Sequence, residues 1–295
     1  RIHRHLQYEA YLLHEVLHPG RHNYLRYLTL LSAVVYGFEI LFPWRTALPR
    51  VRRDFWLDGF YMFFNFFLFS LIGFNAASNV VVALWDDLLG LLGLRNVVAL
   101  QVRTWPAWCQ LGLLFVVKDF IQWNTHRLLH RVPWLWEFHK VHHSVQQMGF
   151  AAHLRYHWFE NVVYKAIQYV PLSLIGFGVA DFFVVDAFTT AIGHLNHANV
   201  RLSWGPLRYV LNSPAMHIWH HAQEIPQGSY GQNFGITLSA WDYLFGTARV
   251  PADGRDIALG FPGIESFPRT LLGQLTYPWS AQRGRHAIGS GPESA

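Results

Sequence analysis

The residues best suited to chemistry in this sequence are its histidines. The chain has 295 residues and 18 histidines, and twelve of these lie between His126 and His221. They form five clusters, which are His126/His130, His139/His142/His143, His153/His157, His194/His197 and His217/His220/His221. Residues three or four apart share one face of a helix, so each cluster can direct its ring nitrogens at one point. Neutral imidazole is a common ligand of iron, zinc, copper and nickel, and the clusters therefore predict a metal site.

The number of histidines indicates two metal ions. A zinc ion takes about four ligands and an octahedral ion about six, and the clusters offer more nitrogens than one ion can use. Two ions with four or five histidines each, and with open positions, fit this number. Such an all-nitrogen set of ligands suits iron that must bind O2, and the residues alone also allow zinc.

The composition of the chain indicates a protein that meets lipid. Hydrophobic residues make up 52% of the chain and charged residues only 14%, against about 25% charged residues in an ordinary soluble domain. The net charge of +5 is modest and the basic residues are spread out, so no nucleic-acid partner is expected. The one cysteine, Cys109, makes neither an intrachain disulfide nor a cysteine metal cluster.

Long apolar runs predict membrane-spanning helices, because a helix that crosses a membrane needs about 20 mostly apolar residues. The candidate runs are 27–44, 59–85, 104–117 with a helical continuation to residue 130, and 166–180 with a return leg over 182–197. The arginine-rich loop 45–53 indicates the cytoplasmic side by the positive-inside rule. This orientation predicts an integral membrane protein whose histidine clusters lie on the cytoplasmic side.

Five segments of the chain match the motif order of one known family. The stretch DFIQWNTHRLLHRVPWLWEFHKVHH contains HxxxH followed by HxxHH, and residues 217–221 form a second HxxHH. LRYHWFE is similar to an Arg-Phe-His-Pro-x-Glu segment, with Trp158 at the usual proline position. GHLNHANVRL is similar to a His-x-Asn segment, and NFGITLSAWDYLFGT to a C-terminal Trp-Asp-x-Leu-Phe-Gly-Thr segment. Over about 116–247 the chain thus resembles the fatty acid hydroxylase/sterol desaturase superfamily of integral-membrane di-iron oxygenases.

The resemblance implies an all-α, multi-span transmembrane helical bundle with a cytosolic histidine-rich cap that holds a dinuclear metal site. Its parts are an N-terminal segment with the first membrane spans (1–110), a fatty acid hydroxylase-like catalytic domain (111–250) and a C-terminal cap and tail (251–295). The metal ligands that it implies are His126, His130, His139, His142, His143, His194, His197, His217, His220 and His221, with His153 and His157 as further candidates.

The activity that the resemblance implies is O2-dependent hydroxylation or desaturation of an unactivated C–H bond in a lipid. A sterol, a fatty acyl chain, an ether lipid and a carotenoid all fit this description, and each would enter from the bilayer. The cofactor would be two iron ions, for which zinc can substitute in purified protein. Electrons would come from a separate donor, either a ferredoxin or a cytochrome b5-like protein with its reductase.

Three polar residues are candidates for holding a ligand histidine by its outer ring nitrogen, as a neighbouring carboxylate commonly does. Asp119 lies seven residues before His126, which places it two helical turns away on one face. The alternative for Asp119 is an ion pair with Lys118 at the membrane edge. Glu160 follows His157 by three residues and could orient it, and His157 could itself be a ligand or hold one.

Two alternatives to an oxygenase remain open. A membrane zinc hydrolase with the same histidine cluster would contain zinc and act without O2. A metal-binding or transport protein would need a polar path, and the run 59–85, which has no charged residue, offers none. The stretch HEVLH at 14–18 matches the HExxH zinc-protease motif, but Pro19 and Gly20 follow at once and end a helix, so we expect this match to be accidental.

Overall fold

The described part of the chain is mostly helical. A computed structural model describes residues 24–75, 87–88, 90–91, 93, 102–173 and 179–289. The long helices are α2 (Tyr24–Leu41), α3 (Phe55–Asn75), α5 (Ala107–Arg131), α7 (Trp158–Ser173), α8 (Val179–His197) and α11 (Leu271–Gly289). The shorter α-helices are α6 (Pro133–His143), α9 (Pro214–His220) and α10 (Ala240–Leu244). The 3-10 helices are η2 (Val102–Thr104), η3 (Phe150–Leu154), η4 (Gly205–Tyr209) and η5 (Ile264–Ser266).

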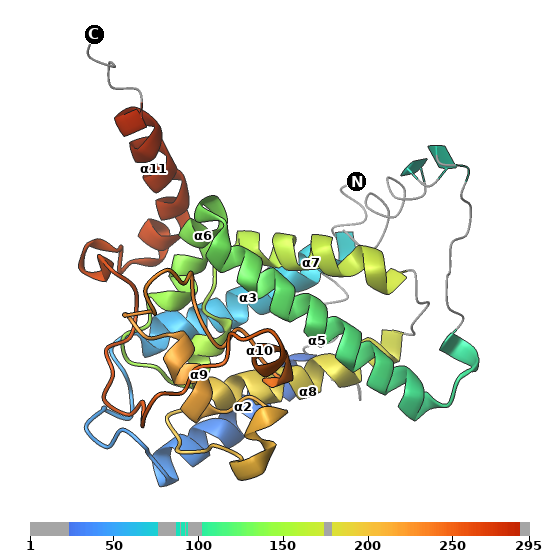
Figure 1. Cartoon of the computed structure of the whole chain (residues 1–295), viewed down its shortest axis with the longest axis horizontal. Helices are drawn as coiled ribbons and strands as arrows, with labels where there is room; N and C mark the ends of the chain where they lie inside the picture. Colours follow the sequence, from blue (N-terminus) through green and yellow to red (C-terminus); the bar gives the residue numbers. More distant parts are fainter. Residues whose placement is uncertain are drawn as a thin grey trace.

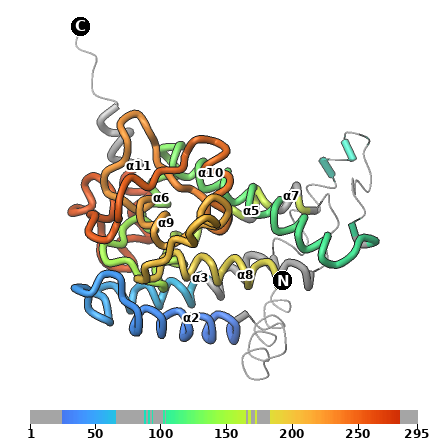
Figure 2. Tube along the Cα trace, turned by 60° about the horizontal axis from the view of Figure 1, so that its bottom comes forward, coloured from blue at the N-terminus to red at the C-terminus, as the bar shows by residue number. Residues whose placement is uncertain are grey.

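The helices α2, α3, α5, α7 and α8 form a bundle that ends in a cap (Figure 1). α5 packs against α6, α7 and α8, while α2 lies against α8 and α3 against α7. Figure 2 shows the cap, made of α6, α9, α10 and the loops around them, at one end of this bundle. The bundle core contains Leu114 of α5, Leu172 of α7 and Val185 of α8 in one buried cluster. The histidines therefore lie where the bundle meets the cap.

Two short helices of the cap begin with proline in the first turn. Pro133 follows Val132, one residue after α5 ends, and Pro214 follows Ser213. Proline is favoured at this position because its fixed φ suits the helix and its missing N–H would have no partner there. Ser213 also caps α9, because its side chain accepts a hydrogen bond from Met216 N. These starts fix a tight corner between α5 and α6 and the entry into α9.

The predicted membrane-spanning bundle is wrong: in the part of the chain that the structure describes, no helix combines the length and the apolar character needed to cross a membrane. α2 carries Glu39, which is buried and pairs with Arg52 at 2.9 Å. The apolar run of α5 stops about halfway along its 25 residues, at the adjacent charges Lys118 and Asp119. In α2 and α5, charged side chains that meet partners inside the protein thus interrupt the runs in which we had predicted spans.

Two stretches of the predicted runs lie outside the described residues. They are 76–85 in the second run and 174–178 in the fourth. The cytoplasmic orientation was inferred by counting the spans, and it stays a prediction. The division of the chain at residues 110 and 250 also stays a prediction.

Candidate metal centre

The structure gathers nine of the ten histidines that we predicted as ligands into two groups. In each group the available ring nitrogens lie within 4.8 Å of one another. The five-histidine group contains His126, His130, His139, His143 and His220, and the four-histidine group contains His142, His197, His217 and His221. Each HxxHH motif is divided between the groups. Its first and last histidines, which lie four residues apart, belong to one group, and its middle histidine belongs to the other. The two groups therefore lie side by side.

Backbone carbonyl groups hold five of these rings at Nδ1. The pairs are His126 with Phe234 O at 2.7 Å, His130 with Tyr230 O at 3.2 Å, His142 with Arg155 O at 3.0 Å, His197 with Gly193 O at 2.8 Å and His220 with Gln232 O at 2.8 Å. A carbonyl oxygen only accepts hydrogen bonds, so in each pair Nδ1 donates its hydrogen. The Nε2 atom of each ring is left with a lone pair, which is the form that binds a metal.

The Nε2 atoms of several rings in the two groups face one another at short range. In the five-histidine group, His126 Nε2 lies 3.1 Å from His139 Nε2. In the four-histidine group, His197 Nε2 lies 3.3 Å from His142 Nε2 and 3.1 Å from His217 Nε2. Because His126, His142 and His197 carry their hydrogens on Nδ1, no proton lies between His142 and His197 to join their Nε2 atoms. A cation between such nitrogens removes their mutual repulsion.

Other ring nitrogens of the two groups are buried without a hydrogen-bond partner among the described residues. They are the Nε2 atoms of His130, His143 and His220 and both ring nitrogens of His221. A buried polar atom without a partner is costly and indicates a missing ion or water. The residues present therefore fit one metal ion in each group, a prediction that awaits metal analysis.

Burial keeps the histidines of both groups in the neutral form. Desolvation lowers the pKa of His126 and of His197 from 6.5 to about 4. It also lowers the pKa of the other seven well below 6.5, and neighbouring histidines lower it further. A histidine must be neutral to bind a metal, so at pH 7 both groups are ready to do so.

The part of the chain that carries both groups matches a known family. Residues 111–247 match the family model of fatty acid hydroxylases. The fatty acid hydroxylase domain over 111–247 and the curated relatives support the fatty acid hydroxylase/sterol desaturase superfamily for this region of the chain. The chain is 33% identical over 189 residues to the ornithine lipid hydroxylase OlsE of Rhizobium tropici, and the match covers 64% of this chain and 56% of that protein.

Two further relatives are named as an alkylglycerol monooxygenase and a very-long-chain aldehyde decarbonylase. The alkylglycerol monooxygenase of Caenorhabditis elegans is 26% identical over 184 residues, which cover 61% of this chain and 33% of that protein. The very-long-chain aldehyde decarbonylase GL1-6 of Oryza sativa subsp. indica is 24% identical over 217 residues, which cover 66% of this chain and 31% of that protein. The chain therefore spans about half to a third of the length of these relatives. No solved structure matches it.

Glu160 in α7 holds one ring of the five-histidine group. Its Oε2 lies 2.7 Å from His139 Nδ1, and its Oε1 accepts a hydrogen bond from His157 N at 3.3 Å. Burial raises the pKa of Glu160 to about 8, whereas a cation on the far side of the His139 ring would favour the carboxylate. The sequence had paired Glu160 with the His157 ring, and the structure instead places its carboxylate against His139.

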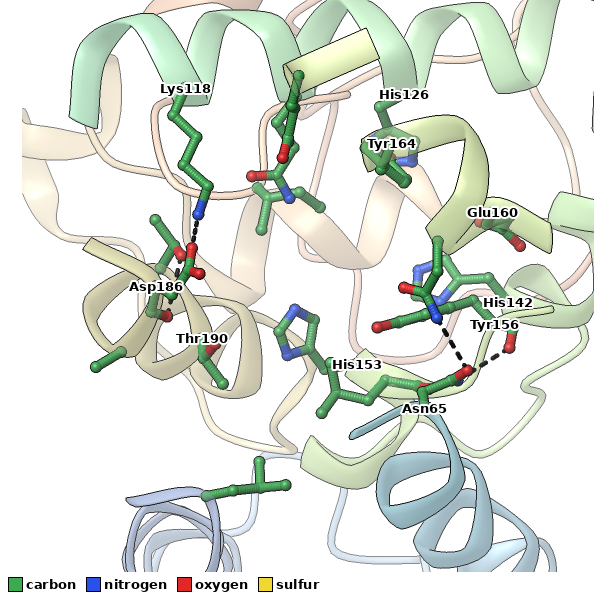
Figure 3. A pocket seen from close by; sticks show the side chains of 18 of the residues that line it. Asn65, Lys118, His126, His142, His153, Tyr156, Glu160, Tyr164, Asp186 and Thr190 are labelled. Carbon is green, nitrogen blue, oxygen red and sulfur yellow. Dashed lines mark hydrogen bonds and ion pairs between the residues drawn. The ribbon is translucent and has the colours of Figure 1, made fainter. Parts of the chain in front are cut away.

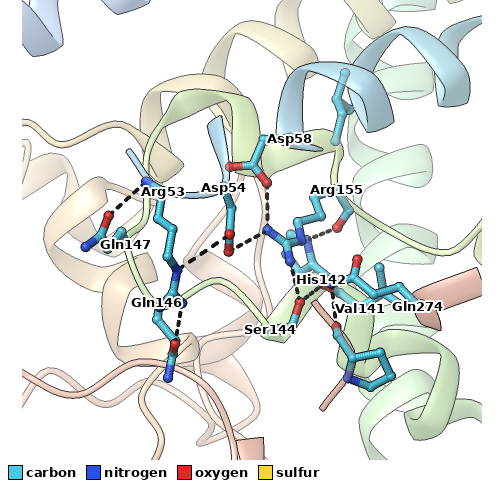
Figure 4. A network of polar contacts seen from close by, with 12 residues as sticks. Arg53, Asp54, Asp58, Val141, His142, Ser144, Gln146, Gln147, Arg155 and Gln274 are labelled. Carbon is cyan, nitrogen blue, oxygen red and sulfur yellow. Dashed lines mark hydrogen bonds and ion pairs between the residues drawn. The ribbon is translucent and has the colours of Figure 1, made fainter. Parts of the chain in front are cut away.

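A buried ionic network fixes the carbonyl group that holds His142 (Figure 4). Arg155 accepts the His142 hydrogen bond at its backbone oxygen, and its guanidinium donates to Asp58 at 2.9 Å, Asp54 at 3.3 Å and Ser144 Oγ at 3.0 Å. Burial raises the pKa of Asp58 to about 6, while the Arg155 charge acts in the opposite direction. Arg155 therefore ties α3 and the end of α6 to a carbonyl group of the metal centre.

The segment 230–235 supplies three of the carbonyl oxygens through its backbone. Asp242 fixes this segment, because it accepts hydrogen bonds from Phe234 N at 2.9 Å and from Trp123 Nε1 at 3.0 Å. Gly231 has a φ of 152°, and a side chain there would come within 3.0 Å of His130 Nδ1. The lack of a side chain at Gly231 lets the backbone approach the five-histidine group closely.

Two of the predicted site histidines pair with each other outside both groups. His194 Nδ1 lies 2.8 Å from His153 Nδ1, and His194 Nε2 lies 3.3 Å from Ser32 Oγ. The His153 ring also stands beside His197 of the four-histidine group, with 5.1 Å between the ring centroids. His194 thus reaches the metal centre only through neighbouring rings in this structure, and its role as a ligand stays a prediction.

Two further predicted residues also meet partners away from the grouped nitrogens. His157 Nε2 lies 3.1 Å from Leu275 O, and its Nδ1 accepts a hydrogen bond from Phe159 N at 3.1 Å. Asp119 accepts a hydrogen bond from Trp241 Nε1 at 2.9 Å. The structure thus uses both nitrogens of His157 in backbone contacts and turns Asp119 towards α10.

A cavity of about 230 Å³ lies beside both groups (Figure 3). Its walls come from α2, α3, α5, α6, α7, α8 and the turns around η3. His126 and His139 of the five-histidine group and His142 of the four-histidine group line it, and the ion pair between Lys118 and Asp186 lines it as well. A molecule in this cavity would therefore contact histidines of both groups.

Sequence reasoning missed three features of this site: the role of Arg155, the segment 230–235 and the Lys118–Asp186 pair. Arg155 lay within the LRYHWFE segment without an assigned role. The carbonyl groups of 230–235 leave no signal, because every residue has one. For the ion pair, a signal did exist, since Asp186 is a charged residue within the apolar run 182–197.

Proposed function

We propose that this chain is a di-iron oxygenase that inserts one atom of O2 into a C–H bond of a lipid. The observation that carries the proposal is the pair of neutral histidine groups beside one cavity. The five-histidine group and the four-histidine group fit two ions, and His126, His139 and His142 bring both groups to the cavity wall. The names of the relatives, which include a lipid hydroxylase and a monooxygenase, favour hydroxylation over desaturation.

The proposed reaction consumes O2, two electrons and two protons for each C–H bond that becomes C–OH, and it releases water. When bound, iron supplies the O2 activation that amino-acid side chains lack. The electrons come from an external reductant, and we propose a small redox protein of the ferredoxin or cytochrome b5-like class with its reductase. Zinc can occupy the same nitrogens in purified protein, because zinc binds such sites more strongly than ferrous iron.

The chain's own residues position the substrate and the ligand nitrogens. Backbone-held rings keep the Nε2 atoms at the cavity edge, and Glu160 keeps the His139 ring in place. Leu28 and Leu31 of α2, together with Ile236, give the cavity apolar wall for the carbon atoms of a lipid. Placing substrate and ligand nitrogens together in fixed geometry is the contribution that a protein makes to such chemistry.

Mass spectrometry of lipids from a host with and without this chain tests the proposal. The expected result is a lipid that gains one oxygen when the chain is present and O2 is supplied. A loss of two hydrogens would show desaturation, and a cleaved lipid that forms without O2 would show the zinc hydrolase instead.

A variant pair sharpens this experiment. His143→Ala removes a histidine of the five-histidine group and is expected to abolish the product. His14→Ala, in the HEVLH stretch outside the described residues, is expected to leave the product near its original level. Metal quantification on protein purified without chelator should give two ions per chain, and a value near one would contradict the dinuclear site.

A further inference from the structure

The Lys118–Asp186 ion pair occupies an unusual place for two charges. Lys118 of α5 contacts Asp186 of α8, and their side chains are 8% and 21% exposed. Both residues line the cavity that reaches the histidines, as Figure 3 shows. A buried ion pair contributes little to stability, because removing two charges from water costs about as much as their attraction returns. Stability alone is therefore a weak reason for this pair.

The spacing along α5 sets the distance between the ion pair and the metal centre. Lys118, Gln122 and His126 all line the cavity and follow one another at intervals of four residues. Eight residues of α-helix rise about 12 Å. On α7, Tyr164 and Gln168 line the same cavity at an interval of four. The cavity thus leads from the ligand histidines to the ion pair past hydrogen-bonding side chains.

The chemistry of the ion pair defines what it can bind. The Lys118 ammonium has three donors, and the Asp186 carboxylate has several acceptor sites, so a bond between them does not exhaust either group. A ligand with its own carboxylate or phosphate and its own ammonium would place each charge beside its opposite. A ligand with one charge would leave one half of the pair facing a like charge or a neutral group.

We propose that the Lys118–Asp186 pair is a binding site for the zwitterionic head group of the lipid substrate. This inference rests on the proposed function and adds the substrate class to it. The cavity of about 230 Å³ is smaller than the roughly 300–1,000 Å³ of pockets that enclose a drug-sized ligand. A head group and its first carbons fit this space, whereas long chains must lie outside. The ligand histidines lie about 12 Å along α5 from this pair, so the carbon that is oxidised lies several bonds from the charged groups, among the first carbons attached to the head group.

Binding of three matched probes to the metal-loaded full chain tests the charge preference. N-dodecanoyl-ornithine is a zwitterion, its methyl ester is only a cation, and N-dodecanoyl-norvaline is only an anion on the same carbon skeleton. Calorimetry below the probes' micelle-forming concentrations should show the zwitterion binding about tenfold or more tightly than either other probe, because an unpaired buried charge is costly. Equal binding of the three probes by the unaltered chain would overturn the proposal.

A double variant removes the pair while keeping the fold. Lys118→Met/Asp186→Met replaces the ion pair by two apolar side chains, a change that is often neutral or stabilising for a buried pair. It should bind the three probes with nearly equal affinity and keep its metal content. The matched control is Arg201→Met/Asp253→Met, which removes an exposed pair whose side chains are 75% and 48% exposed. The control should keep the preference, and a preference that survives in the Lys118/Asp186 variant would overturn the proposal.

Fragmentation of the product lipid tests the position of the new oxygen. Tandem mass spectrometry should find it among the first carbons attached to the head group, several bonds from the charged groups, and an oxygen in the distal half of an acyl chain would contradict the inference. The two proposals fail separately. Lipids that gain oxygen without any charge preference would refute only the head-group site. A charge preference without any oxidised lipid would refute the oxygenase and leave the binding site intact.

Discussion

Removing the Glu160 carboxylate should weaken metal binding in the five-histidine group alone. In the Glu160→Ala variant, His139 Nδ1 loses the oxygen that lies 2.7 Å away. The ring can then rotate, and its Nε2 no longer faces His126 Nε2 in a fixed position. The other eight grouped histidines keep their partners. We therefore expect a loss of affinity for one of the two ions.

The size of this loss follows from the contact itself. A hydrogen bond to a charged group contributes about 1.5–3 kcal/mol, and each 1.4 kcal/mol changes an equilibrium constant about tenfold. The expected loss is therefore about 10-fold to 150-fold in metal affinity. Outer hydrogen-bond partners of ligand histidines usually account for about 10–100-fold, which agrees with this range. Glu160→Gln should lose less, because its amide oxygen can still accept from His139.

Chelator competition with the metal-loaded protein measures both affinities, provided that the two ions are released in separate steps. Asp119→Asn is the matched control, because Asp119 is also a buried carboxylate but bonds Trp241 rather than a ligand ring. The control should release both ions as the unaltered chain does. If Glu160→Ala retained both ions with unchanged affinity, or weakened both equally, the assignment of Glu160 to one group would be refuted.

Three further predictions concern the metal centre. Metal-free protein should lose stability as the pH falls from 6.5 to about 4, because in this pH range histidines of the unfolded chain bind protons, whereas buried histidines such as His126 do not. Urea unfolding at pH 7 and pH 5 measures this loss, and equal stability at the two pH values would contradict the prediction. His143→Ala should lower the metal content from two ions towards one. His157→Ala should keep both ions, because both of its ring nitrogens contact backbone groups away from the grouped histidines; metal loss in the His157 variant would enlarge the set of ligands. Gly231→Ala should cost about 1–3 kcal/mol of stability, because the backbone conformation of Gly231 is strained for other residues. It should also weaken metal binding by the five-histidine group, which contains the neighbouring His130. Unchanged unfolding and unchanged metal affinity would show that the loop adapts.

The convergence of the histidines could be predicted from the sequence, because helical spacing places residues three and four apart on one face, as in HxxxH on α5 and HxxHH on α6 and α9. The spacing did not predict that each HxxHH motif is divided between the two groups. The sequence also indicated two ions with four or five histidines each. His194 has the same spacing relation to His197 and still lies outside both groups, because its ring turns towards Ser32 and His153. Spacing identifies a shared face, and the direction of one ring depends on its neighbours.

The rest could not be predicted because it depends on contacts between distant parts of the chain. The oxygen atoms that hold five of the rings belong to the backbone, and a backbone carbonyl group is the same in every residue. The predicted membrane spans rested on hydrophobicity along single runs. Within those runs, Glu39 and Asp186 find their partners Arg52 and Lys118 only when separate segments pack together. Pairing across the fold thus overrides what each run suggests by itself.

The division of each HxxHH motif between the two groups has a consequence for how the groups move. α6 and α9 each contribute rings to both groups, so the spacing between the groups is tied to the dimensions of two helices. Helical backbones change little in length. A displacement of either helix would therefore alter both groups together, and neither group can be adjusted through these helices alone.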